Sequence, residues 1–332
     1  MHPKICVYGA GAIGCHIAGH LARTGRADVS VVDREETVSA IQKNGIRVIT
    51  PKEDFTVRVT ASTNPETLGI QDYVIITLKI QQLVGLLTDI AHLVGPRTTV
   101  IPPSTGIPYY FFHNLSGRYD NARMVEVDPD ERQWQTLPPS QVLPLVFWYG
   151  AHRVGPGVTQ QDGEDGRYPL GELDGSDSER LHVLASLLEA GGLSAPVSKN
   201  IRGEIWTKFA NSLCGNPIAV LTLSDMNGFA ASPGVLKVFE TMLKEVDTIG
   251  NVVGITIPQS ISERMAFTLS TGDHKFSMLQ DLESGRPLEI DAFIQSLAAA
   301  KRISGTDTPT CDIVLSLVEL RNVQHRKHLQ AR

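Results

Sequence analysis

A glycine-rich turn near the N-terminus constrains this chain more than any other segment. The run Gly9-Ala10-Gly11-Ala12-Ile13-Gly14 follows a strand-like stretch at residues 5–8 and opens a helical pattern. Gly9 permits the tight turn, Gly11 lets a pyrophosphate approach the backbone, and Gly14 lets helix and strand pack closely. Phosphate would lie where the helix N-terminus presents free N–H groups and a positive dipole. The turn therefore predicts a bound dinucleotide, and a purely structural turn is the alternative. The residues expected to bind it are Gly9, Gly11, Ala12, Ile13 and Gly14.

Short β-rich runs alternate with helical patterns through the first half of the chain, which predicts a parallel sheet covered on both faces. The expected strands are 5–8, 29–32, 73–77 and 98–101, and the expected helices are 14–24, 37–44 and 82–94. Residues 119–140 are irregular and proline-containing, so we expect a long surface excursion there. Strands are expected again at 142–149 and 167–170, followed by a helix at 178–190.

From residue 203 onward, apolar residues recur at helical spacing with hardly any alternating segment. The fold class is therefore an α/β Rossmann-like domain over residues 1–199 followed by an all-α domain over residues 200–332. At 332 residues the length agrees with two domains. Apolar helices of the second half, such as residues 313–320, are expected to be core.

The overall composition excludes several classes of protein. The 30 Lys and Arg residues are scattered among 36 Asp and Glu, which argues against nucleic-acid binding. Apolar runs such as 73–78 are far too short to cross a bilayer, and the N-terminus enters a strand without a signal peptide. The cysteines are widely separated, which predicts a reduced cytoplasmic protein with no disulfide and no metal site. They are Cys6, Cys15, Cys214 and Cys311.

Asp33 and Arg34 end the second expected strand, where Rossmann domains distinguish NAD from NADP. A carboxylate 19 residues beyond Gly14 would accept hydrogen bonds from the ribose 2′-hydroxyl and repel a 2′-phosphate, whereas an arginine would do the opposite. Both residue types are present, so the residues alone leave the cofactor open.

A file of polar residues marks one face of a helix in the second half. At about 100° per residue, Ser212 and Asn216 lie on the side of Lys208, and Asn211 flanks them. Pro217 is expected to stop or kink this helix. A desolvated lysine beside amides suits a general acid for a carbonyl oxygen, because burial brings its pKa toward neutrality. A solvated lysine with helix-end amides is the alternative.

Two further segments have structural interpretations. Ser277 and Gln280 have the spacing of a capping box, and Pro287 is expected to begin a helix with Glu289 in its first turn.

Taken together, these segments resemble the ketopantoate reductase (2-dehydropantoate 2-reductase) family almost from end to end. The resemblance implies a Rossmann-type domain, a helical C-terminal domain and NADPH-dependent reduction of a 2-oxo acid to a 2-hydroxy acid. The segments that carry it are residues 9–14, 77–79, 105–110, 154–158, 170–175, 206–217 and 277–291.

The resemblance also implies roles for individual residues. Lys208 matches the catalytic lysine that protonates the carbonyl oxygen, and Glu289 matches an active-site glutamate. Asn216 and Ser277 match residues that contact the substrate, and Ser212 and Asn211 are expected to line the same site.

On the cofactor side, Lys79 matches a cofactor-binding lysine and Arg34 the arginine that faces the 2′-phosphate. The resemblance thus favours NADP(H), and Asp33 keeps NAD(H) open. The pair Thr105-Gly106 stands where the family has Asn-Gly near the nicotinamide.

Thr105 is one of three departures from the family pattern. Ser212 replaces the first asparagine of the catalytic helix, and Gln160 replaces a frequent histidine. Shorter hydroxyl side chains lose the paired donor and acceptor of an amide, which changes substrate discrimination. The alternatives are therefore reduction of another small carbonyl or imine, or a dinucleotide-binding protein without catalysis. Pantothenate biosynthesis, a small-molecule substrate, a cytoplasmic location and a homodimer are expectations at the family level.

Overall fold

The computed structural model describes residues 2–330 and divides them into two compact units. Unit 1 holds residues 2–104, 113–115 and 130–201, and unit 2 holds residues 105–112, 116–129 and 202 onward. The sequence placed a single boundary between residues 199 and 200. The structure differs because two pieces of the irregular segment after residue 104 pack within the helical unit.

Packing explains this reassignment. The aromatic run 109–112 is fully buried, and the ring centroid of Phe111 lies 5.8 Å from that of Trp206. The guanidinium of Arg302 makes a two-point ion pair with Glu126, with N–O distances of 2.7 and 3.0 Å. The expectation that residues 119–140 form a surface excursion is therefore wrong in part, since this segment contains buried side chains such as Leu137.

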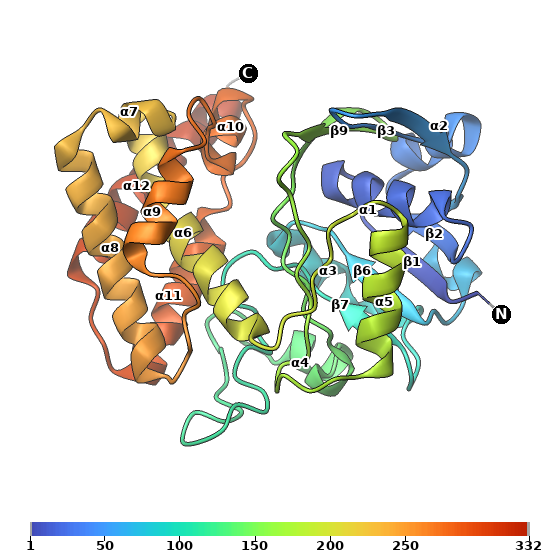
Figure 1. The fold of residues 1–332 in the computed structure, drawn as a ribbon, viewed down its shortest axis with the longest axis horizontal. Helices are drawn as coiled ribbons and strands as arrows, with labels where there is room; N and C mark the ends of the chain where they lie inside the picture. The colour runs from blue at the N-terminus through green and yellow to red at the C-terminus, as the bar shows by residue number, and fades with distance from the viewer. Residues whose placement is uncertain (1, 331–332) are drawn as a thin grey trace. The chain divides into compact units, whose positions relative to one another are not determined.

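The main sheet of unit 1 is entirely parallel, with the strand order β5-β2-β1-β6-β7 (Figure 1). Its strands are buried on both faces and therefore read as continuous apolar runs, which confirms the expected α/β class. The order reverses beside β1, so the carboxyl ends of β1 and β6 form the switch point where ligands bind in such folds. The strands are β1 (Lys4–Tyr8), β2 (Asp28–Val32), β5 (Thr60–Ser62), β6 (Tyr73–Ile76) and β7 (Thr99–Ile101).

A second, four-stranded sheet was not predicted. Its order is β4-β3-β9-β8, formed by Asp54–Val57, Ile46–Ile49, Val158–Asp162 and Gly150–Gly155. The strands expected at 142–149 and 167–170 are wrong, since they make only isolated bridges. Pro144 and Pro169 lie inside them, and a proline lacks the N–H group that a continuous ladder needs.

Helix α1 (Ala12–Arg23) packs against strands of both sheets of unit 1. A β-carbon on Gly19 would lie 2.4 Å from Val48 of the second sheet, so only glycine permits this approach. The remaining helices of unit 1 are α2 (Glu35–Asn44), α3 (Ile80–Ala91), α4 (Arg132–Thr136), α5 (Glu179–Ala190) and the 3₁₀ turns Pro65–Leu68 and Pro139–Gln141.

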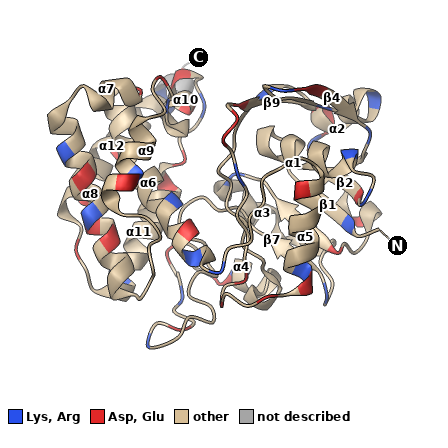
Figure 2. Cartoon of the chain, viewed as in Figure 1, with Lys and Arg blue, Asp and Glu red and all other residues tan. Residues whose placement is uncertain are grey.

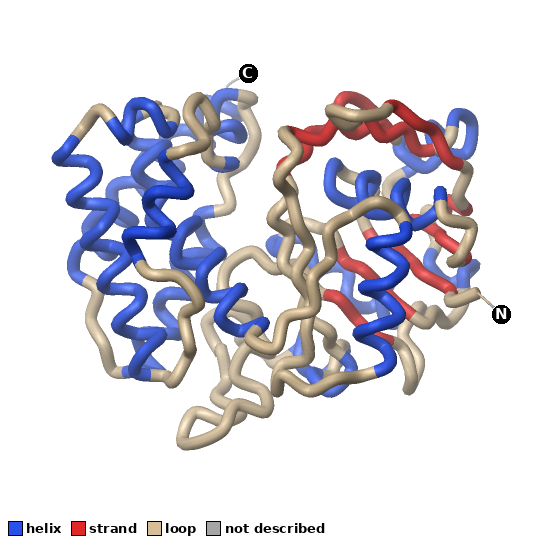
Figure 3. The backbone as a smooth tube through the Cα atoms, in the orientation of Figure 1, coloured by secondary structure: helices blue, strands red, loops and turns tan. Residues whose placement is uncertain are grey.

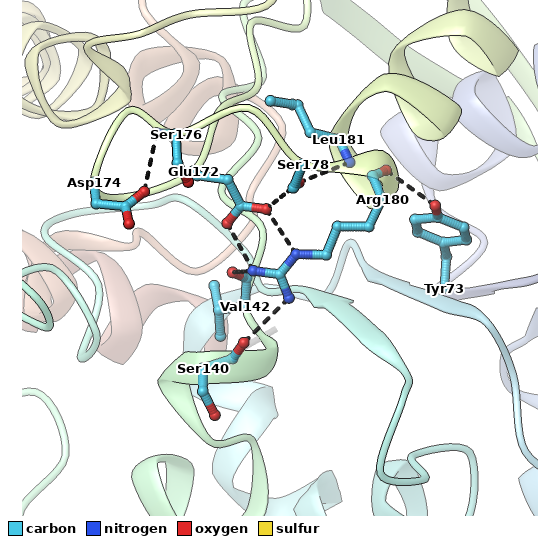
Figure 4. Close-up of polar contacts among 9 residues, drawn as sticks. All are labelled: Tyr73, Ser140, Val142, Glu172, Asp174, Ser176, Ser178, Arg180 and Leu181. Carbon is cyan, nitrogen blue, oxygen red and sulfur yellow. Dashed lines mark hydrogen bonds and ion pairs between the residues drawn. The ribbon is translucent and has the colours of Figure 1, made fainter.

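A partly buried ion pair links the start of α5 to neighbouring segments (Figure 4). Arg180 donates to both carboxylate oxygens of Glu172 at 2.7 Å and also to the carbonyls of Ser140 and Val142. Glu172 lies in the 170–175 segment that contributed to the family resemblance. Its contacts are structural.

Unit 2 is all-helical, as expected, in the residues that the structure describes (Figure 3). Helix α6 (Ile201–Thr222) does not stop at Pro217 and runs five residues beyond it. The other helices are α7 (Met226–Ala230), α8 (Pro233–Val252), α9 (Ile261–Leu269), α10 (Ser277–Glu283), α11 (Ile290–Ser304) and α12 (Pro309–Gln330).

Two surface properties bear on the expectations. Lys, Arg, Asp and Glu are interspersed along both units (Figure 2). Between residues 2 and 330, no helix is both long and apolar enough to span a membrane. The expectation that residues 313–320 are core is wrong in part, because Ile313 and Leu317 on α12 are 64% and 53% exposed.

Candidate active site

The glycine turn has the geometry that its sequence predicts. Gly9 has a φ of +100°, which favours glycine. A β-carbon on Gly14 would lie 1.8 Å from the carbonyl oxygen of Gly9, so the helix can approach the strand only without one. A β-carbon on Gly11 would meet nothing within 4 Å, so the turn is open on that side. The hydroxyl of Thr77, at the end of β6, donates to the Gly9 carbonyl at 2.5 Å.

The turn offers free donors at the start of α1. Among the described residues no side chain caps the helix at Gly11, and the first helical N–H bond runs from Cys15 to the Gly11 carbonyl. Gly11, Ala12 and Ile13 are half-exposed. Backbone N–H groups at an uncapped helix N-terminus suit a pyrophosphate. The described residues therefore fit the dinucleotide that the sequence predicts.

Asp33 and Arg34 follow β2 but lie in different environments. The Asp33 carboxylate accepts from the backbone N–H of Ala10 at 2.5 Å and from that of Arg34 at 2.6 Å. Its side chain is 14% exposed, whereas that of Arg34 is 83% exposed. The carboxylate is thus fixed beside the glycine turn, and the guanidinium extends into solvent.

The other expected cofactor residues belong to different units. Lys79 stands at the N-cap position of α3, shortly after β6 in unit 1, and is half-buried. Thr105 and Gly106 belong to unit 2, where a β-carbon on Gly106 would lie 2.5 Å from the Ser296 hydroxyl. That hydroxyl accepts from the Ile107 N–H at 2.9 Å. In unit 2, Gly106 thus allows its segment to pack closely on α11.

Lys208 is half-buried in the middle of α6. Burial lowers the pKa of its ammonium to about 8, and the negative charge of Glu289 partly opposes this shift. Lys208 and Glu289, the two residues expected to be catalytic, therefore interact electrostatically. Such a lysine is still largely protonated at pH 7 and can release its proton readily.

Glu289 lies at the N-cap position of α11, which begins at Ile290. The expectation that this helix begins at Pro287 is wrong by three residues. Glu289 is half-buried and lies one residue before the helix, where the N-terminal dipole favours a carboxylate.

Asn216 is 2% exposed, and its amide hydrogen bonds are internal. Its oxygen accepts from the Met278 N–H at 2.9 Å and the Ser277 hydroxyl at 3.4 Å, and its nitrogen donates to the Ser212 carbonyl at 3.0 Å. The capping box expected between Ser277 and Gln280 is wrong, because α10 begins at Ser277 and receives its cap from α6. Ser277 itself is exposed.

A second contact fixes α10 against α6. A β-carbon on Gly215 would lie 2.0 Å from the ring of Phe276, so the aromatic ring packs directly on the glycine backbone. Gly215 therefore has a packing role in the helix, although glycine is a poor helix former.

Ser212 and Asn211 complete the polar file, and both are half-buried. The Asn211 side-chain oxygen is buried, and no group in the described part of the chain forms a hydrogen bond with it. Gln160 lies on β9 in unit 1, opposite Ile49 and His152, and is exposed.

The supporting contacts of Thr77, Ser296 and Phe276 were not predicted from the sequence. Thr77 and Phe276 lie in or beside segments that carried the family resemblance, yet no role was assigned to them. Their partners are far away in the chain, so only an indication of contacts between distant residues could have revealed them.

Two family models and a curated relative match most of this chain. The family described as Ketopantoate reductase PanE/ApbA matches residues 5–175, and its C-terminal counterpart matches residues 200–322. A 2-dehydropantoate 2-reductase of Mesorhizobium japonicum is 40% identical over 315 residues, which are 95% of this chain and 96% of that protein.

Solved structures are similar over nearly the whole chain. One from Ralstonia solanacearum MolK2, assigned to the ketopantoate reductases, has a TM-score of 0.90 at 34% identity and covers 98% of this chain and 99% of its own. The 2-dehydropantoate 2-reductase of Geobacter metallireducens GS-15 has a TM-score of 0.83 at 26% identity, with 96% and 99% coverage. The chain belongs to the ketopantoate reductase family.

Proposed function

We propose that this protein reduces a 2-oxo acid to a 2-hydroxy acid with a nicotinamide dinucleotide, and that 2-dehydropantoate is the first substrate to test. The observation that carries the proposal is the environment of Lys208, in which burial lowers its pKa to about 8 and the charge of Glu289 partly opposes that shift. The glycine turn and the name of the 40% identical relative support it independently.

The proposed reaction adds two hydrogens to the carbonyl group. The bound cofactor supplies a hydride to the carbonyl carbon. Lys208 donates a proton to the oxygen as negative charge develops there, giving the alcohol and a neutral amine, which regains its proton from solvent. Partial burial strengthens the interaction between the ammonium and the developing charge.

Other residues of unit 2 would position the reactants. The negative charge of Glu289 would stabilise the ammonium of Lys208. The exposed Ser277 hydroxyl would contact the substrate. Asn216 acts one step away, by fixing Ser277 and the start of α10. The half-buried Asn211 and Ser212 would line the same site with an amide and a hydroxyl.

Unit 1 would hold the dinucleotide through Gly9, Gly11, Ala12, Ile13 and Gly14. Lys79, Thr105 and Gly106 are proposed to contact it on the nicotinamide side. With NADP(H), which the family resemblance favours, Arg34 would bind the 2′-phosphate. With NAD(H), Asp33 would accept a hydrogen bond from the ribose 2′-hydroxyl.

The test is oxidation of NADPH and NADH by 2-dehydropantoate and a panel of other 2-oxo acids. We expect Lys208→Met to lower kcat about 10²- to 10⁴-fold, because it removes the proton donor. Lys237→Met, at an exposed lysine of α8, is the matched control and should retain activity. Equal activity in the two variants would remove Lys208 from the mechanism.

The alternatives predict different results. A binding protein without catalysis would bind the cofactor, yet none of the acids would be reduced. A reductase of imines or other small carbonyls would form product only with those compounds, which product analysis in the presence of amines would reveal.

The family also leads us to propose a role in pantothenate biosynthesis, a cytoplasmic location and a homodimer. The exposed apolar side chains Ile313, Leu317 and Leu320 share one face of α12 and support an interface there. Sedimentation of the protein and of a Leu317→Glu variant tests the dimer. An unchanged mass would exclude that face.

A further inference from the structure

Thr105 is the exception in an otherwise buried stretch of chain. Residues 98–112 are all buried except Thr105, which is half-buried. The preceding strand, β7, is parallel to β6 and β1, so it ends at the edge of the sheet where the glycine turn begins. Thr105 follows the end of β7 by four residues. Within this stretch it is therefore the residue best placed to contact a ligand.

Helix α11 fixes the backbone that follows Thr105. Gly106 has a φ of +75°, and a β-carbon on it would lie 2.5 Å from the Ser296 hydroxyl and 3.1 Å from the Ala292 carbonyl. The Ile107 N–H donates to the same Ser296 hydroxyl at 2.9 Å. Ile107 is 0% exposed and Ser296 is 1% exposed, so water does not compete for this hydrogen bond. One hydroxyl thus holds both residues that come after Thr105.

The same helix carries the carboxylate that acts on Lys208. Glu289 is the N-cap of α11, and Ser296 follows it by seven residues. At about 100° per residue, seven residues make almost two full turns, so both residues lie on about the same face, roughly 10 Å apart along the axis. This face of α11 therefore acts on the charge of Lys208 at one end and holds the segment after Thr105 further along.

We propose that Ser296 is a positioning residue, which presents Thr105 to the nicotinamide end of the bound dinucleotide by holding the backbone of Gly106 and Ile107. The inference rests on the proposed function, in that a nicotinamide dinucleotide binds and Thr105 contacts it. Ser296 itself is buried and acts only through its neighbours. Because Ser296 and Glu289 share one rigid helix, the contact to the hydride donor keeps a fixed spacing from the charge that acts on the proton donor.

The Ser296→Ala variant removes the acceptor of a buried N–H group. An unpaired buried N–H is costly, so the backbone of Gly106 and Ile107 should shift toward another partner and displace Thr105. The pyrophosphate is proposed to bind at the glycine turn, in a different part of the chain. Only the contact to the nicotinamide end should therefore weaken.

The experiment measures dissociation constants by isothermal titration calorimetry of the full chain without substrate. NADPH is compared with 2′-phospho-ADP-ribose, a fragment that lacks the nicotinamide, and NADH with ADP-ribose forms a parallel pair. Ser296→Ala should weaken binding of the dinucleotide about fivefold or more and binding of the fragment less than about twofold. Thr105→Ala should show the same pattern. The double variant should bind within about twofold of Thr105→Ala, because both substitutions remove one contact.

Thr308→Val is the matched control. Thr308 is also fully buried in unit 2, and its hydroxyl lies 3.2 Å from a carboxylate oxygen of Asp312. This variant should be less stable than wild-type protein and should leave the ratio of the two affinities unchanged.

Three results would overturn the inference. An unchanged dinucleotide affinity in Ser296→Ala is the first, and equal losses for dinucleotide and fragment are the second, because the hydroxyl would then serve the fold alone. The third is a double variant in which the two losses multiply, since Ser296 would then act independently of Thr105. Should Ser296→Ala fail to fold, as judged by circular dichroism, Ser296→Cys keeps a similar volume with a weaker acceptor and decides by the same ratio.

These results are separable from the proposed function. Protein whose dinucleotide affinity depends on Ser296 through Thr105, but which reduces no carbonyl compound, leaves the inference intact and removes the proposed reaction. Protein that reduces 2-oxo acids, but whose Ser296→Ala variant binds dinucleotide and fragment as wild-type protein does, gives the reverse.

Discussion

In the proposed mechanism, Lys208 would donate a proton from an environment that is neither fully aqueous nor fully apolar. Burial alone would favour the neutral amine, and the carboxylate of Glu289 restores part of the stability of the ammonium. The resulting pKa of about 8 leaves the proton in place at neutral pH while making its release easy.

This balance predicts the pH dependence of the reduction. Because the protonated lysine is the active form, kcat/KM should be level below pH 8 and fall about tenfold per pH unit above it. Glu289→Gln removes the charge that raises this pKa, so the decline should begin at a lower pH. Steady-state rates between pH 5.5 and about 9.5 would measure both effects.

Asp291→Asn is the control for that measurement, since Asp291 is two residues away and pairs with Arg326 at 3.0 Å. It should leave the position of the decline unchanged. A Glu289→Gln profile that coincides with the wild-type profile would mean that the carboxylate does not act through the lysine.

At the scale of elements, the site depends on places where a glycine lets another part of the chain approach the backbone closely. The strand-turn-helix unit around Gly14 and the helix pair around Gly215 both leave no room for a β-carbon. The sequence shows both glycines but not the atoms that exclude a β-carbon. These atoms are the Gly9 carbonyl oxygen across the turn and the Phe276 ring from a distant segment.

The Gly14→Ala variant tests this for the turn. Its β-carbon would clash with the Gly9 carbonyl, so α1 must move away from β1. We expect the free energy of unfolding to fall by about 1–3 kcal/mol and dinucleotide binding to be lost. Gly85→Ala lies on the exposed side of α3 with open space around it, and it should stabilise the protein by up to about 1 kcal/mol. Chemical denaturation of both variants gives the comparison, and an equally stable Gly14→Ala protein would refute the argument.

At the scale of the whole molecule, acid stability should be limited by unit 1. His16 is fully buried on α1, where it bonds to the Tyr168 hydroxyl at 2.9 Å and to Gln161 at 3.0 Å. Burial lowers the pKa of His16 to about 4, and the nearby His20 contributes to the shift. Both rings are therefore neutral in the folded protein at neutral pH.

The sign of the effect follows from the proton count. Between pH 6.5 and 4 the unfolded chain binds a proton at residue 16 that the folded chain does not, so stability should fall as the pH falls through this window. The loss attributable to His16 approaches about 3 kcal/mol near pH 4. Thermal unfolding of wild-type protein and of His16→Gln across this range is the measurement. Identical slopes for the two proteins would assign the acid sensitivity to other groups.

Local sequence patterns were enough to predict the alternation of strands and helices in unit 1, the helical second half, the glycine turn and the polar file on α6. These features are local, because they depend on the spacing of apolar residues, on glycine and on helix periodicity within a few turns. The family resemblance added that Lys208 and Glu289 belong together, which spacing alone does not indicate.

Tertiary structure alone decided which residues support the site. The second sheet, the burial of residues 109–112 in unit 2 and the cap that Asn216 gives to α10 all depend on contacts between distant parts of the chain. It likewise fixed the Asp33 carboxylate on the Ala10 N–H, 23 residues away. A buried polar group must find a partner wherever the fold provides one, and local sequence does not say where that partner lies.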